Sequence, residues 1–87
     1  MRINAIIEEI KELKNERNHC SALKIVSLLE NNQKLFLAAM DASDLNFMLR
    51  NFEELSQTQP KDYNSAAFKS DYEKHFESLL FHFNRIS

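Results

Sequence analysis

Apolar residues recur along this chain at spacings of three and four, the period of an α-helix, and no segment shows the alternation of a β-strand. Helices joined by short connections pack side by side around one core. We therefore expect an all-α fold, a small antiparallel helical bundle of about four helices, in a single domain spanning residues 1–87. The predicted helices cover approximately residues 3–17, 20–40, 44–57 and 62–85.

Each predicted helix carries an apolar stripe, and we expect these stripes to form the core. The second stripe is the widest, which predicts a central helix with neighbours on two sides. Its middle, "ENNQ", is a poor helix interior, so the pattern is compatible with one helix or with two divided near Asn31–Asn32. The stripes consist of Ile3, Ile6, Ile7, Ile10 and Leu13; Ala22, Ile25, Val26, Leu29, Phe36 and Met40; Leu45, Met48, Leu49, Phe52 and Leu55; and Phe68, Tyr72, Phe76, Leu79, Phe83 and Ile86.

The chain has no glycine, one proline and nine asparagines. Phosphate-binding loops and nucleophile elbows depend on glycine, because they need a positive φ or a close approach of the backbone. Asparagine tolerates the left-handed conformation that ends many helices. We therefore predict short Asn-rich turns, with Asp41 or Ser43 capping the third helix and the last helix beginning at Asp62 or Asn64.

Charge and cysteine content narrow the functional classes. The formal net charge is -2, without the basic excess of a dedicated nucleic-acid surface, so we do not expect nucleic acid as a partner. The longest uncharged apolar run, residues 35–40, is far shorter than a membrane span needs, and we expect no membrane association. Cys20 is the single cysteine, so the chain cannot form an internal disulfide. We predict a cytoplasmic protein in which Cys20 is a small buried residue. The alternative is a reactive thiol, activated by the dipole at the N-terminus of the second helix.

Two histidines and four aromatic residues fall in "YEKHFESLLFHF", residues 72–83. His75 and His82 are seven residues apart, about 10.5 Å along a helix, which is too far for one metal ion. We expect both histidines at the edge of the core, with no metal and no cofactor. Asp71, His75 and Ser78 share one helical face and have the residue types of an acid–base–nucleophile relay. The chain offers no evident oxyanion-binding loop beside them, and we expect no enzymatic activity.

Two phenylalanines lie on the polar side of their predicted helices. Phe81 is about 180° from the stripe of the last helix, and Phe47 lies opposite the stripe of the third. Aromatic side chains ringed by charged residues are typical of anchors in protein interfaces. Alternatively, both helices pack on two neighbours and the rings belong to the core, or the rings are incidental, since single exposed hydrophobic residues are common on protein surfaces. The predicted partner-binding residues are Phe47, Phe81, Arg50, Glu54, Glu77 and Arg85.

These observations predict a small non-enzymatic protein that binds another protein and acts by occluding or recruiting it, as inhibitors, immunity proteins, anti-defence proteins and adaptors do. The alternative is a self-associating helical bundle, a possible homodimer with a structural or assembly role. The two hypotheses differ in what covers Phe81, which is a foreign surface in the first and a second copy of the chain in the second. Neither hypothesis involves a small-molecule substrate.

Overall fold

The computed structural model of the protein describes residues 2–58 and 65–86, and within these residues the chain forms five α-helices and no strand. The predicted all-α class is confirmed, whereas the predicted number of about four helices is not. The additional helix arises because the segment predicted over residues 20–40 is divided at Asn32. The helices are α1 (Arg2–Lys11), α2 (His19–Asn31), α3 (Gln33–Ala39), α4 (Ala42–Ser56) and α5 (Ala66–Asn84).

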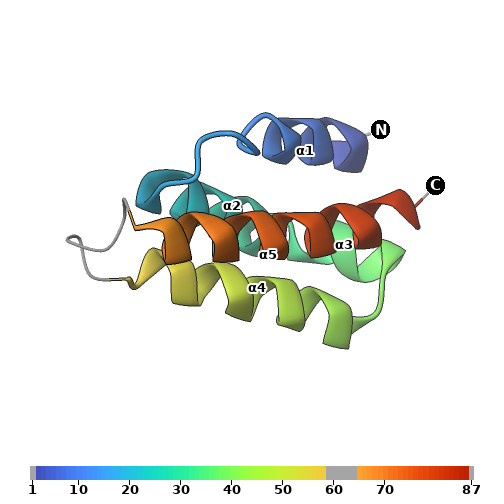
Figure 1. The fold of residues 1–87 in the computed structure, drawn as a ribbon. Coiled ribbons are helices and arrows are strands. Elements are labelled where there is room, and N and C mark those ends of the chain that lie inside the picture. Colours follow the sequence, from blue (N-terminus) through green and yellow to red (C-terminus); the bar gives the residue numbers. More distant parts are fainter. Residues whose placement is uncertain (1, 59–64, 87) are drawn as a thin grey trace.

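The helices lie roughly along one long axis, and the chain reverses direction after α1, after α3 and between α4 and α5 (Figure 1). Helices α2 and α3 together form one leg of the bundle, which runs alongside α4 and α5. Helix α1 lies on the outside and covers one edge of this arrangement. The principal axes measure 38 × 20 × 19 Å, so the bundle is about twice as long as it is wide. No described helix is both long and apolar enough to cross a membrane.

The connection between α1 and α2 is longer than predicted, because α1 ends at Lys11 and not near residue 17. The chain continues in tighter turns, in which the Leu13 amide donates to the Ile10 carbonyl at 2.9 Å. Arg17 then adopts the left-handed conformation, with a φ of 46°, and it is the single residue with a positive φ in the described part of the chain. We had predicted asparagine for left-handed positions, so this expectation is wrong at this turn. Asn18 serves instead as the N-cap of α2, where its side chain accepts from the Ser21 amide at 2.8 Å.

The break between α2 and α3 is centred on Asn32. Its side chain donates to the Leu28 carbonyl at 2.8 Å, which occupies an acceptor that a continuous helix would use. The break answers the question that the sequence left open, in favour of two helices.

The remaining turns also correct the predicted turn chemistry. The connection between α3 and α4 consists of Met40 and Asp41 and contains no asparagine. Asp41 occupies the N-cap position of α4, but its side chain makes no capping hydrogen bond. The predicted starts of the last helix, Asp62 and Asn64, lie outside the described residues, and α5 begins after Ser65, whose hydroxyl accepts from the Phe68 amide.

The core is formed by the predicted stripes, although five of their residues are only partly buried against it: Ile3, Ile6, Leu13, Met40 and Ile86. Its densest part is aromatic: Phe52 meets Tyr72 and Phe76 edge to face, and Phe36 stacks on Phe83 with 5.7 Å between ring centroids. All these rings are buried, which leaves the opposite faces of α4 and α5 to solvent. The buried core residues are Ile7, Ile10, Ala22, Ile25, Val26, Leu29, Phe36, Leu45, Met48, Leu49, Phe52, Leu55, Phe68, Tyr72, Phe76, Leu79 and Phe83.

Candidate functional site

Phe81 lies on the outer face of α5 and is 61% exposed, the largest exposure among the described large hydrophobic residues. The Arg85 guanidinium lies over the ring, 5.8 Å from its centroid, and the His82 ring meets it edge-on at 5.7 Å. A cation over an aromatic face is attracted by the ring quadrupole. These contacts hold the Phe81 ring in place on the surface without burying it.

Phe47 lies on the outer face of α4 and is 52% exposed. Arg50 and Glu54, which follow at three and seven residues, are exposed on the same side of the helix. The inner face of α4 is fully occupied by the core, so α4 positions Phe47 rigidly toward solvent. The exposure predicted for both rings from helical phase is confirmed, and the alternative that they belong to the core is wrong.

The two rings lie near the same end of the α4–α5 pair. Because α4 and α5 run antiparallel, Asp44 near the start of α4 meets His82 near the end of α5, with 3.8 Å between Oδ2 and Nδ1. Phe47 follows Asp44 by less than one helical turn, and Phe81 directly precedes His82. A small hollow of about 200 Å³, lined in part by Asp41, opens beside these groups.

We call this region the α4–α5 outer surface, and it comprises Phe47, Arg50, Glu54, Glu77, Phe81 and Arg85. All six side chains are exposed. Direct contact is recorded between Phe81 and Arg85, and among the described residues no hydrogen bond, ion pair or ring contact links the α4 members to the α5 members. Glu77 lies one helical turn before Phe81 and borders a second hollow with Arg17 and Glu73. Among the described residues, the predicted set therefore lies on two adjacent helices, with direct contact between Phe81 and Arg85.

The histidine-rich segment serves the core and its edge. His75 is half-buried with its ring edge-on to Phe52, and His82 is half-buried beside Asp44, as predicted for both. In the described part of the chain, no group of three or more His, Cys, Asp or Glu side chains could hold a metal ion. No hydrogen bond among the described residues connects Asp71, His75 and Ser78, so the structure does not assemble the relay that their spacing allows.

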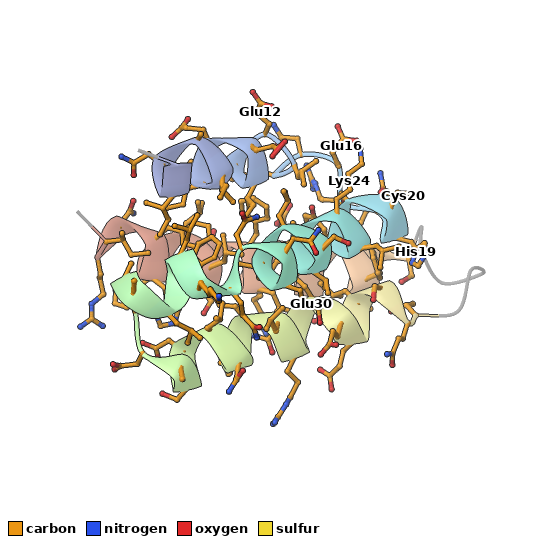
Figure 2. The ribbon with its side chains drawn as sticks, turned by 180° about the vertical axis from the view of Figure 1, so that it is seen from behind. Glu12, Glu16, His19, Cys20, Lys24 and Glu30 are labelled. Atoms are coloured by element: carbon orange, nitrogen blue, oxygen red, sulfur yellow. The ribbon has the colours of Figure 1, made fainter. Side chains whose placement is uncertain are left out.

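Cys20 is exposed, so the prediction that it is buried is wrong. Placing the residues of α2 at 100° intervals puts Cys20 roughly 170° from the centre of the buried stripe, and this signal was available in the sequence. Figure 2 shows Cys20 in the first turn of α2. Leu23 and Leu37 are also exposed, at 48% and 47%, and were not predicted as surface residues.

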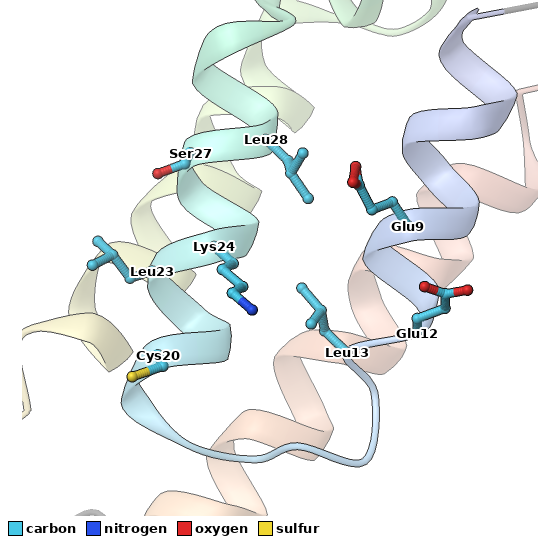
Figure 3. A pocket seen from close by; sticks show the side chains of 8 residues that line it. All are labelled: Glu9, Glu12, Leu13, Cys20, Leu23, Lys24, Ser27 and Leu28. Atoms are coloured by element: carbon cyan, nitrogen blue, oxygen red, sulfur yellow. The ribbon is translucent and has the colours of Figure 1, made fainter.

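A groove of about 600 Å³ separates α1 from α2 and was not predicted. Leu13 and Leu28 point into it from opposite sides, and the Lys24 side chain reaches into the same space (Figure 3). Glu9 and Glu12 form part of the α1 wall. The groove depends on how α1 rests on α2, which periodicity along the chain does not specify.

Comparison with known proteins adds no relative, because no protein family, no curated protein and no solved structure matches this chain.

Proposed function

We propose that the protein is a non-enzymatic binding protein that docks its α4–α5 outer surface onto another protein. The observation that carries this proposal is the exposure of Phe47 and Phe81 on helices whose opposite faces fill the core. Such helices present a side chain rigidly, so little conformational freedom is lost when a partner covers it. The contact between Phe81 and Arg85 reduces that loss further.

The free energy of burying Phe47 and Phe81 indicates how many other residues a partner must contact. Burying a phenylalanine side chain completely contributes about 1.5–3 kcal/mol, so two half-exposed rings supply roughly 2–3 kcal/mol. A micromolar complex requires about 8 kcal/mol, which the two rings do not reach alone. The charged members of the surface therefore take part as well, as a polar rim that sets orientation and excludes wrong partners. Arg50 and Arg85 favour a partner with acidic groups opposite them.

The mode of action that fits this surface is occlusion or recruitment. A small rigid bundle with two aromatic anchors adds no chemistry to its partner, and it changes what else the partner can contact. Inhibitor, immunity, anti-defence and adaptor roles all use this mechanism. We place the protein in the cytoplasm, because an exposed thiol without a cysteine partner in its own chain suits a reducing compartment.

Affinity capture with matched variants tests the proposal. The immobilised chain, Phe47→Ala and Phe81→Ala are incubated with extract of the source cell, and bound proteins are quantified by mass spectrometry. Leu23→Ala is the control, because Leu23 is a large exposed hydrophobic residue on α2. We expect a partner that binds the parent chain and Leu23→Ala equally and is reduced at least about fivefold by Phe47→Ala, since an anchor contributes over 1 kcal/mol. Equal capture by all four proteins would refute the proposal.

A further inference from the structure

We infer that α5 pairs with α5 of a second copy of the chain, around a two-fold axis that passes beside Phe81. The inference rests on the proposed function, because it uses one of the two anchors of the α4–α5 outer surface. It goes further by naming the occupant of that anchor. Phe81 is assigned to self-association in the free protein, and a foreign partner that covers the α4–α5 outer surface competes with this pairing for Phe81.

The first support is a straight ridge on α5. Glu77, Phe81 and Arg85 follow each other at intervals of four residues, so they form one ridge along the helix surface. All three are exposed. At a rise of 1.5 Å per residue, Glu77 and Arg85 lie about 6 Å on either side of Phe81. An acid and a base thus flank the aromatic ring symmetrically.

The second support is that this ridge is complementary to itself. When two such ridges pack antiparallel around a two-fold axis at Phe81, each Glu77 meets Arg85 of the other copy, and the two Phe81 rings meet at the axis. A two-fold contact uses the same surface on both copies, which requires this kind of self-complementarity. A parallel pairing would instead place Glu77 on Glu77 and Arg85 on Arg85, which is repulsive. The charge pattern therefore selects the antiparallel pairing.

The third support concerns the arginine itself. The Arg85 guanidinium already lies over its own Phe81 ring, 5.8 Å from the centroid. A guanidinium held in this position keeps its N–H donors free for a carboxylate. The second copy's Glu77 fits that role. A single helix ridge covers less than the roughly 800 Å² per partner of a standard interface, so the dimer is weak and forms with increasing concentration.

Charge reversal tests the pairing on the full chain. Glu77→Arg and Arg85→Glu each replace two attractive pairs by two repulsive ones, and we expect each to weaken the dimer by roughly tenfold or more. Mixed together, the two variants regain the attractive pairs and should associate with each other as well as the parent chain does with itself. The double variant Glu77→Arg/Arg85→Glu should also dimerise. Lys69→Glu is the control, because Lys69 is exposed on α5 and lies outside the ridge.

The measurement is molar mass by light scattering and sedimentation over a wide range of concentrations, with reductant present so that Cys20 cannot cross-link the copies. Circular dichroism confirms that each variant is folded. A parent chain that stays monomeric throughout would overturn the inference, as would a dimer that ignores both charge reversals or variants that fail to associate when mixed. If the parent chain is monomeric and Phe81→Ala loses a foreign partner in affinity capture, the proposed function stays intact. A dimer with the expected charge response but no partner sensitive to Phe47→Ala would contradict the proposed function alone.

Discussion

The Tyr72 hydroxyl donates a hydrogen bond to the Leu13 carbonyl at 2.7 Å and thereby ties the middle of the bundle to the turn that follows α1. Leu13 lies two residues beyond the end of α1, so its carbonyl has no place in a regular helix. The same carbonyl also accepts from the Glu16 amide at 3.2 Å, so the Tyr72 hydroxyl is its second donor and links α5 to the chain between α1 and α2. The same tyrosine ring stacks on Phe76 in the core.

Tyr72→Phe keeps the ring and removes the hydroxyl. We expect it to lower the free energy of unfolding by about 0.5–1.5 kcal/mol, because the Leu13 carbonyl loses one of its two donors in a partly buried site and keeps the Glu16 amide. Urea unfolding followed by circular dichroism measures the change. A variant as stable as the parent chain would show that water replaces the hydroxyl at no cost.

Burial of the Tyr72 hydroxyl also gives the fold a pH dependence. Burial raises the pKa of Tyr72 above its ordinary value of 10.0. A side-chain hydrogen bond with Ser21 acts against this increase without cancelling it, and the nearby Glu16 carboxylate adds to it. In the unfolded chain Tyr72 loses its proton near pH 10, while the folded chain retains it. Unfolding therefore releases a proton above that pH, and the stabilisation is present below pH 10 and lost as the pH rises through the folded pKa.

The comparison of the parent chain with Tyr72→Phe isolates this effect, because lysines and the other tyrosine titrate in both proteins. We expect the stability difference between the two to be constant from neutral pH to about pH 9 and to decrease above about pH 10. Urea midpoints at a series of pH values provide the measurement. A difference that stays constant up to the alkaline limit of the fold would contradict the assignment.

Periodicity along the chain was sufficient to predict which residues form the core but not where each helix ends. Leu13 shows the reason: it occupies a stripe position, and it is partly buried on the core although it belongs to the turn after α1. A tight turn and one further helical turn place this side chain on the same side, so spacing alone does not distinguish them. The end of α1 depends on the Arg17 and Asn18 conformations and on the bond from Tyr72.

For the candidate site, the sequence predicted which side chains are exposed but not how the two helices are aligned. Helical phase is a property of each helix alone, and it indicated correctly that Phe47 and Phe81 face solvent. The proximity of Asp44 to His82 depends on how α4 and α5 are aligned, which requires the packed structure. Cys20 is a different case, because cysteine is among the residue types most often buried, whereas its phase on α2 places it toward solvent.

The cap of α2 gives a prediction at one turn. Asn18 and Ser21 form a reciprocal capping box, in which the backbone N–H of Asn18 also donates to the Ser21 hydroxyl at 3.2 Å. We expect Asn18→Ala to lower the free energy of unfolding by about 1 kcal/mol, within the usual range of 0.5–2 kcal/mol for such caps. Asn15→Ala is the matched control, because Asn15 is exposed in the same turn. Equal losses for both variants in urea unfolding would rule out the capping role.

The contrast between two phenylalanines tests the division between core and surface. Phe52 is fully buried and meets three rings edge-on, so Phe52→Ala should cost about 3–5 kcal/mol. That is a large part of the total stability of a chain of this size. Phe81→Ala should change stability by no more than about 0.5 kcal/mol, because its ring is largely in water already. Thermal and urea unfolding of both variants decide the matter, and a large loss for Phe81→Ala would show that the ring supports the fold.

The exposed thiol of Cys20 gives the last prediction. An aromatic disulfide reagent should label the Cys20 thiol of the folded chain completely. The labelling rate should lie within about a factor of ten of the rate in the unfolded chain, because the reagent reaches the thiol without unfolding. Absorbance of the released thiolate gives the rate. In air and without reductant, dissolved oxygen should slowly oxidise two Cys20 thiols to an intermolecular disulfide, and Cys20→Ser should abolish this covalent dimer. Labelling that requires denaturant would contradict the exposed position of Cys20 on α2.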